Sequence, residues 1–155
     1  MGLDLVRRHL LGEKFEPYLD EDLVVAVEEV MAELDRKPRG LTVDARRCDK
    51  LITLAGYIYS RVTGMFNRAE EDRKEIDAGL YGRGKDELSG KDKRGPSNDQ
   101  ITNWILTQAA HKAAKRKETV LRELRELADA LKEACRARQF IVTELCRLIR
   151  EQEIE

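Results

Sequence analysis

Hydrophobic residues recur every three or four positions through most of the second half of the chain. Residues 97–150 contain neither glycine nor proline, and from Leu124 onward the apolar positions step by three and four. This spacing is typical of a helix that packs lengthwise against other helices. Ser97 and Gln100 have the spacing of a capping box, which marks a helix start. The pattern predicts one long helix over residues 97–150.

A second stretch, residues 42–78, has the same spacing of apolar positions and predicts another long helix. Gly56 and Gly64 lie inside it at some cost in helix propensity, and we expect them to permit close approach of a neighbouring helix rather than to break this one. The two stretches together predict that paired long helices dominate the fold.

The first 41 residues predict shorter helical elements. Residues 3–11 read as a short helix or a fraying terminus. Asp20 is expected to cap a helix over residues 20–36, with acidic residues in its first turn. We therefore treat residues 1–41 as an N-terminal helical segment that precedes the two long helices.

Residues 79–96 differ from their surroundings. They contain five glycines, no apolar periodicity and a basic surplus, and predict a loop. A connection of this length in a small helical protein is usually functional or disordered.

The predicted fold is all-α: an elongated helical hairpin of two long helices over residues 42–155, with short N-terminal helices. If helix 42–78 folds back antiparallel on helix 97–150, it reaches only to about residue 131. The apolar stripe beyond that point lacks a partner within the hairpin, so we expect a coiled-coil-like homo-oligomer. Its seam is predicted to consist of Leu124, Leu127, Leu131, Arg138, Ile141, Leu145 and Leu148. Arg138 is a polar interruption of the kind that can fix register or oligomeric state.

Composition fits this architecture, and the distribution of charge adds one chemical signal. Charged residues make up 38% of the chain and aromatic residues 5%, which suits long, solvent-exposed helices with narrow apolar seams. The net charge is −1, yet residues 79–118 carry 9 basic against 5 acidic residues. Cations beside glycines suit phosphate binding, and Tyr81 suits stacking on unpaired bases. Trp104, between Ile101 and Ile105, is better explained as a core residue.

The candidate DNA-binding residues gather before, within and after the predicted loop. They are Arg73, Lys74, Tyr81, Arg83, Lys85, Lys91, Lys93, Arg94, Lys112, Lys115 and Arg116. In a helical hairpin these groups would meet at one end.

No catalytic constellation is recognisable in the sequence. His9 and His111 are far apart, and no phosphate-binding loop or nucleophile motif accompanies them. The three cysteines lack metal-ligand spacing. We therefore expect no enzyme activity, metal or cofactor. Without a signal peptide or a long apolar run, the expected location is the cytoplasm, with no membrane contact.

One further pattern covers roughly two-thirds of the chain. A long helix ends in the basic pair Arg73-Lys74, a Gly-Leu-Tyr-Gly-Arg-Gly turn follows over residues 79–84, and Ser97-Asn98-Asp99 opens the final helix. The final helix then carries Leu127, Ala130, Leu131 and Arg136 or Arg138. This order resembles the UvsY family of phage recombination mediators.

The resemblance implies an oligomeric protein that binds single-stranded DNA without covalent chemistry. Such proteins contact a RecA-like recombinase and a single-strand-binding protein, and help the recombinase replace the latter on DNA. Several basic patches, one per copy, would hold one strand with high avidity and no sequence readout. The expected setting is the cytoplasm of a phage-infected bacterium.

Two other functions fit the helical pattern. The first is a non-enzymatic coiled-coil structural or assembly protein, for example of a phage particle, whose charged loop contacts protein. The second and weaker is a helical inhibitor of a host enzyme. The basic loop discriminates between scaffold and mediator, because a scaffold tolerates its neutralisation whereas a mediator does not.

Overall fold

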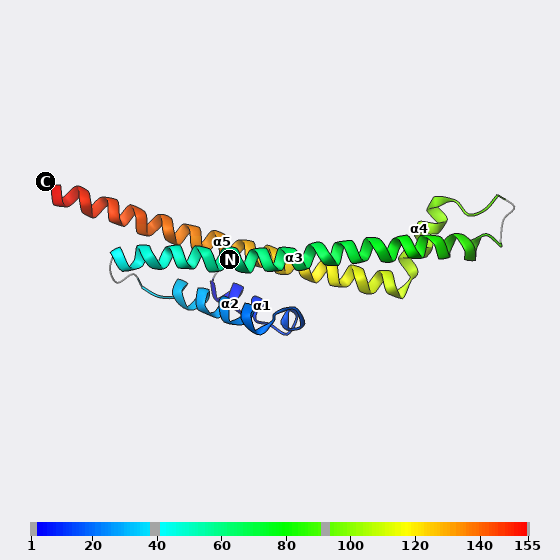
Figure 1. Ribbon diagram of the computed structural model, residues 1–155, viewed down its shortest axis with the longest axis horizontal. Helices are drawn as coiled ribbons and strands as arrows, with labels where there is room; N and C mark the ends of the chain where they lie inside the picture. Colours follow the sequence, from blue (N-terminus) through cyan, green and yellow to red (C-terminus); the bar gives the residue numbers. More distant parts are fainter. Residues whose placement is uncertain (1–2, 38–40, 91–93, 155) are drawn as a thin grey trace. The chain divides into compact units, whose positions relative to one another are not determined.

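The computed structural model describes residues 3–37, 41–90 and 94–154, and these residues form helices and connections without any strand. The all-α prediction is confirmed. Figure 1 shows the α-helices, which are α1 (Leu3–Leu10), α2 (Glu21–Leu34), α3 (Leu41–Leu88), α4 (Asn98–Thr107) and α5 (Ala109–Ile154), and a short 3-10 turn covers Glu16–Tyr18.

Contacts divide the chain into two compact units, to which both long helices contribute. The terminal unit consists of residues 1–63 and 123–155, and the central unit consists of residues 64–122. Each unit has buried apolar side chains of its own.

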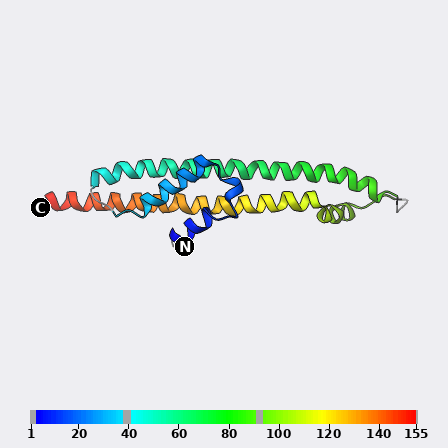
Figure 2. The same ribbon diagram turned by 90° about the horizontal axis from the view of Figure 1, so that it is seen from below.

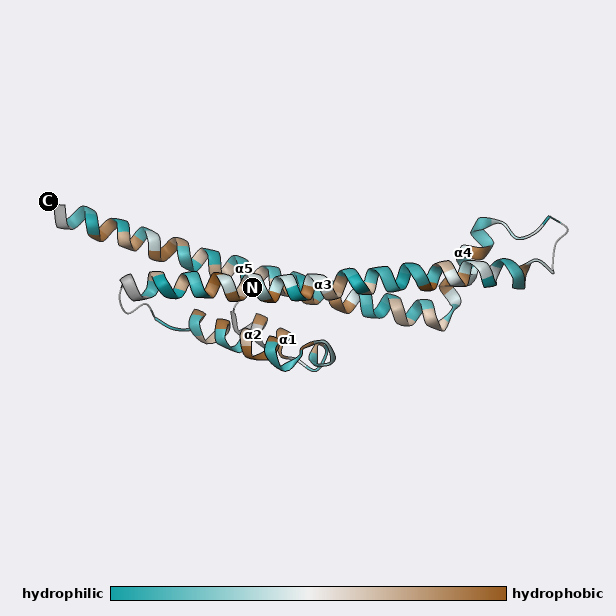
Figure 3. Ribbon diagram, in the orientation of Figure 1, coloured by the Kyte–Doolittle hydropathy of each residue, from teal (hydrophilic) through white to brown (hydrophobic). Residues whose placement is uncertain are grey.

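The terminal unit is built around α2, which is capped as predicted. The Asp20 side chain accepts a hydrogen bond from the backbone N–H of Leu23 at 2.9 Å, and this bond lowers the pKa of the Asp20 carboxyl below its usual value. The buried face of α2 consists of Leu23, Ala26, Val27, Val30, Met31 and Leu34. In Figure 2 α2 lies beside both long helices, consistent with a core shared by three helices. The hydrophobic positions within this unit are brown in Figure 3.

The predicted seam of α5 divides into a buried part and an exposed part. Leu124 and Leu131 are fully buried and belong to the chain's own core, so their assignment to an interface between copies is corrected. The N-terminal segments give this part of α5 a partner within the chain, because Arg8, His9 and residues 12–15 line one common groove with Leu127. Ile141, Leu145 and Leu148 are exposed.

The predicted end of the first long helix at residue 78 is wrong. Helix α3 continues to Leu88, so the connection to α4 begins at Ser89 rather than at residue 79. The physical reason is packing: Leu80 is buried, and Leu88 packs against the same cluster. These contacts outweigh the low helix propensity of the intervening glycines.

Gly56 and Gly64 lie within α3, as expected, but the close helix approach predicted at these positions is not present. A Cβ atom added at either position would meet nothing within 4 Å. No close helix approach therefore depends on these two glycines.

The predicted helix 97–150 is broken at Gln108, and its second part runs on to Ile154. The capping box at its start is confirmed: Ser97 N–H donates to Gln100 Oε1 at 2.8 Å, and Gln100 N–H donates to Ser97 Oγ at 3.3 Å. Gln108 is extended, with φ −72° and ψ 137°.

Side chains explain why α4 ends at this point. The carbonyl of Trp104 accepts hydrogen bonds from Thr107 Oγ1 at 2.6 Å and from Gln108 Nε2 at 3.2 Å. The Gln108 N–H donates instead to the Ile105 carbonyl at 3.0 Å. Local side-chain bonds therefore replace the helical bond that Trp104 would otherwise accept.

Candidate nucleic-acid interface

A small apolar cluster docks α4 on the last turns of α3 in the central unit. Its buried members are Leu80, Ile101 and Ile105, and Ile76, Leu88 and Trp104 pack against them. The docking is tight at Gly84, where an added Cβ would lie 2.7 Å from Trp104 Cε3. Trp104 is therefore a core residue here, as predicted.

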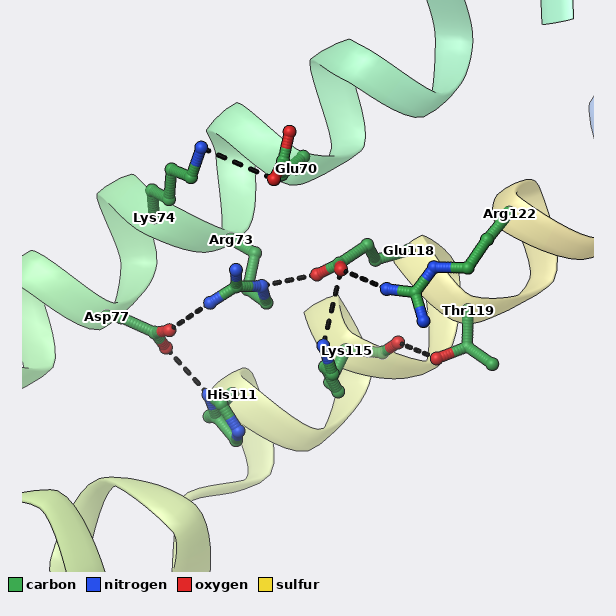
Figure 4. Close-up of polar contacts among 9 residues, drawn as sticks. All are labelled: Glu70, Arg73, Lys74, Asp77, His111, Lys115, Glu118, Thr119 and Arg122. Atoms are coloured by element: carbon green, nitrogen blue, oxygen red, sulfur yellow. Dashed lines mark hydrogen bonds and ion pairs between the residues drawn. The ribbon is translucent and has the colours of Figure 1, made fainter. Parts of the chain in front are cut away.

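A polar network continues the contact between α3 and α5 within the same unit (Figure 4). Its centre is Glu118, whose side chain is only 3% exposed. Arg73 Nε donates to one carboxylate oxygen, while the other oxygen accepts from Lys115 Nζ at 3.2 Å and from Arg122 Nη2 at 2.8 Å. Burial raises the pKa of Glu118, but the hydrogen bonds from Arg73 and Lys115 outweigh it, so the net shift lowers this pKa.

Asp77 joins the same network to the first turn of α5. It accepts a hydrogen bond from Arg73 Nη1 at 2.8 Å, and its other oxygen lies 2.7 Å from His111 Nδ1. The hydrogen bond to Glu118 raises the pKa of Arg73 further above its usual value, although burial opposes the shift. Arg73 is thus held between two carboxylates, and the start of α5 is held against α3.

Sequence reasoning missed this network, although a signal for it was present. On α5, Glu118 lies three residues before buried Leu121, and His111 lies seven residues before Glu118. These steps keep both residues on the buried face of the helix. On α3, Arg73 lies four residues after buried Ala69, again on the packed face. Charged residues at the apolar positions of a helical pattern indicate ion pairs buried between helices.

The structure separates the predicted DNA-binding cations into two groups. Arg73 and Lys115 belong to the Glu118 network, and Lys74 Nζ lies 3.4 Å from Glu70 Oε1. Their charges are therefore offset by carboxylates within the chain. Lys91 and Lys93 lie outside the described residues.

The second group, which we call the open cations, consists of Arg83, Lys85, Arg94, Lys112 and Arg116. All of them are exposed. Among the described residues none of them makes an ion pair, in contrast to Arg73, Lys74 and Lys115. All belong to the central unit, so they remain available for an external anion.

Two of the open cations lie near the same contact between α3 and α5. Lys112 follows His111, which contacts Asp77. Arg83 lies six residues beyond Asp77 on α3, about 9 Å along the helix axis at 1.5 Å per residue. Arg83 and Lys112 thus both lie near the contact between Asp77 and His111.

Tyr81 lies among these cations and has a fixed orientation. Its hydroxyl donates to Asn98 Oδ1 at 2.8 Å, while the residue as a whole remains 42% exposed. A tethered, exposed aromatic ring beside cations is suited to stacking on a base.

Charge also differs between the two units. The central unit carries 13 Lys and Arg against 10 Asp and Glu, whereas the terminal unit carries 16 against 20. A polyanion is therefore attracted to the central unit and repelled by the terminal unit.

Other candidate residues have roles within the chain. Arg138 donates to the backbone carbonyl of Arg36 just after α2, a favourable position for a cation near a helix C-terminus. Burial raises the pKa of Cys135 to about 12, and burial also raises the pKa of Cys48. Within the described residues, no group of three or more His, Cys, Asp or Glu side chains is placed to hold a metal ion.

No helix in the described part of the chain combines the length and the apolar character needed to cross a membrane. Comparisons of the chain with protein-family models, curated proteins and solved structures found no match.

Proposed function

We propose that this protein is a single-stranded DNA-binding recombination mediator of the UvsY type. The observation that carries the proposal is the set of open cations on the central unit: Arg83, Lys85, Arg94, Lys112 and Arg116. Carboxylates within the chain engage many of the neighbouring cations, which leaves these as the sites for phosphates. The resemblance of the sequence to the UvsY family supports the recombination role.

The proposed binding is electrostatic and independent of sequence. The open cations displace condensed counterions from the phosphates of the strand, and a base stacks on the exposed ring of Tyr81. These contacts involve no groove or base edge, so they give no preference for a particular sequence. Stacking on Tyr81 needs an unpaired base, so they favour a single strand over a duplex.

The mediator role also involves partners. We propose a homo-oligomer in which a second copy covers the exposed stripe of Ile141, Leu145 and Leu148 on α5. Several central units would then hold one strand, and a RecA-like recombinase would replace a single-strand-binding protein on it. The proposed setting is the cytoplasm of a phage-infected bacterium.

A structural or assembly coiled coil is the second candidate, since the same exposed stripe favours association. In that role the open cations solubilise the loop or contact protein. Nucleic-acid binding therefore separates the two functions.

The test compares two triple variants with the same change in charge. The site variant combines Arg83→Gln, Lys112→Gln and Arg116→Gln, and the control combines Lys37→Gln, Arg46→Gln and Arg150→Gln, which alter exposed cations of the terminal unit. Binding of a fluorescent oligothymidylate is measured by anisotropy over a range of salt concentrations.

We expect the site variant to bind several-fold to a hundred-fold more weakly than the control. Log affinity falls with log salt, and each lost phosphate contact should reduce the steepness of this fall by about 0.7. Three lost contacts should therefore reduce it by about 2. Equal effects of the two variants would place the interface elsewhere. Absence of binding by the unmodified protein at low salt would favour the structural role.

A further inference from the structure

One face of α5 in the terminal unit carries an apolar stripe that the chain's own core leaves uncovered. Its members follow one another in steps of three, four and seven residues, which keeps them on one side of the helix. At 1.5 Å per residue the stripe is about 32 Å long. We call it the outer stripe, and it consists of Leu127, Ala130, Ala134, Ile141, Leu145 and Leu148, none of which is buried.

The outer stripe has small side chains in one half and large side chains in the other. Both alanines lie in the N-terminal half, whereas the C-terminal half consists of Ile141, Leu145 and Leu148. These three large side chains are 53%, 40% and 48% exposed. They therefore project from α5 where the chain itself supplies no cover.

A groove lies beside the small half of the outer stripe. The end of α1 and the residues that follow it form one wall, α5 forms the other, and the volume between them is about 540 Å³. Lys14 of the first wall forms an ion pair with Glu123 of the second. The apolar part of the lining consists of Gly12, Phe15, Leu127 and Ala130.

The large half of one copy fits the small half of another when the two α5 helices run antiparallel. Leu145 and Leu148 of the second copy then lie over Ala130 and the groove, and two-fold symmetry forms the same contact a second time. A parallel pair would set alanine opposite alanine. Helices held apart by pairs of large residues leave a gap there, and close packing disfavours such a gap.

The charges on α5 favour the same orientation. Residues 123–133 carry four acidic and two basic residues, whereas residues 134–151 carry four basic and two acidic residues. An antiparallel pair sets each half against one of opposite net charge, and a parallel pair sets each half against its like. The outer stripe and its flanks are thus complementary to a second copy of themselves.

We propose that two copies of the chain pair through antiparallel α5 helices, with Leu145 and Leu148 of each copy seated in the groove between α1 and α5 of the other. This inference rests on the proposed function, because it names the contact that builds the homo-oligomer. The pairing gives the groove an apolar occupant and covers the outer stripe along its whole length.

Crosslinking measures the orientation of the two helices. In a Cys146→Ser background, one variant carries Glu126→Cys and the other Glu151→Cys, at exposed positions that flank the outer stripe; the remaining native cysteines are buried. A short bis-maleimide is added to each variant alone and to their mixture, and mass spectrometry identifies the products. When position 126 of one copy faces position 151 of the other, the two 126 positions are about 38 Å apart along the axis. We therefore expect crosslinks only in the mixture.

A change in side-chain size tests the occupant of the groove. Ala130→Phe fills the space that Leu145 of the second copy would take, and should raise the dissociation constant of the pair at least about tenfold in sedimentation analysis. Combining it with Leu145→Ala makes room for the new ring and should restore much of the association. Ala32→Phe, at an exposed position of α2, is the control. Circular dichroism should show equal helicity in all variants.

The outcomes separate this inference from the proposed role in DNA binding. Crosslinks within each variant alone, no crosslinks at all, or equal association of Ala130→Phe and Ala32→Phe would overturn the antiparallel pairing. Binding of a short oligothymidylate at low salt is measured on the same proteins. If that binding persists, the open cations remain the DNA site whatever the pairing. Antiparallel crosslinks without oligothymidylate binding would retain the pairing and overturn the DNA-binding role.

Discussion

At the residue scale, Glu118 shows how a charge is accommodated in a seam between helices. An ionised carboxylate removed from water is costly unless it is paired and hydrogen-bonded. Here Arg73, Lys115 and Arg122 all donate to it, and Arg73 is itself balanced by Asp77. The satisfied network stabilises the central unit, and removal of its centre leaves several cations without their partner.

The first prediction concerns this carboxylate. Glu118→Gln should lower the free energy of unfolding by about 3 kcal/mol at pH 7, the lower end for breaking a buried pair, because Arg122 remains partly exposed. Glu70→Gln, which alters the exposed pair with Lys74, should cost at most about 0.5 kcal/mol. Urea unfolding followed by circular dichroism measures both.

The pH dependence of this difference follows from the lowered pKa of Glu118. A carboxyl with a lowered folded pKa contributes stability above its ordinary value of 4.5, and this stability is lost as the pH falls through the folded value. The gap between the unmodified protein and Glu118→Gln should therefore shrink below pH 4.5. A gap of equal size at pH 7 and pH 3 would contradict the role of the ionised carboxylate.

At the scale of elements, packing between helices decides where α3 and α4 end. The glycine-rich sequence 79–84 is helical because Leu80 and Leu88 pack against α4. Gly84 has a specific role in this contact, since any larger residue would meet the ring of Trp104. Gly82 has none, because a Cβ there would meet nothing within 4 Å.

These two glycines form a matched pair for a second prediction. Gly82→Ala should raise the free energy of unfolding by up to about 1 kcal/mol through helix propensity alone. Gly84→Ala gains the same propensity but overpacks against Trp104, at a cost of roughly 1–3 kcal/mol, and should be less stable than Gly82→Ala. Its tryptophan emission should also shift to longer wavelength. Equal stability and equal emission in the two variants would show that Gly84 is not a packing position.

At the scale of the whole molecule, the end of α5 presents an exposed apolar stripe to a partner. Ile141, Leu145 and Leu148 are 53%, 40% and 48% exposed, and they share one face in steps of four and three. Leu131 is unsuitable for testing association, because it is buried in the chain's own core and a charge there would unfold the terminal unit.

The third prediction therefore uses only exposed positions. Ile141→Ser with Leu145→Ser should convert an oligomer to monomers in sedimentation analysis while helicity is retained. Affinity for long single strands should then fall by about 10²–10⁴, whereas affinity for a strand that reaches one central unit should change little. Val25→Ser with Leu106→Ser alters equally exposed residues and serves as the control. A monomeric unmodified protein at micromolar concentration would contradict the oligomer.

The sequence by itself determined the features that depend on neighbours along the chain. The apolar spacing predicted the all-α fold and most of each long helix, and the capping residues Asp20 and Ser97 predicted two helix starts. The position of Trp104 between two isoleucines predicted its packing. These features are local, because a helix period and a cap are complete within a few residues.

Only the tertiary structure decided the features that depend on residues distant in the chain. The packing of Leu80 on α4 extends α3, and the docking of Trp104 over Gly84 accompanies the break at Gln108. The α5 leucines have equal hydrophobicity, but the N-terminal helices cover some of them and leave Leu145 and Leu148 exposed. Among the cations, carboxylates from another helix engage Arg73 but not Arg83. Burial and pairing depend on which surface lies opposite, and the local pattern of a helix does not contain that information.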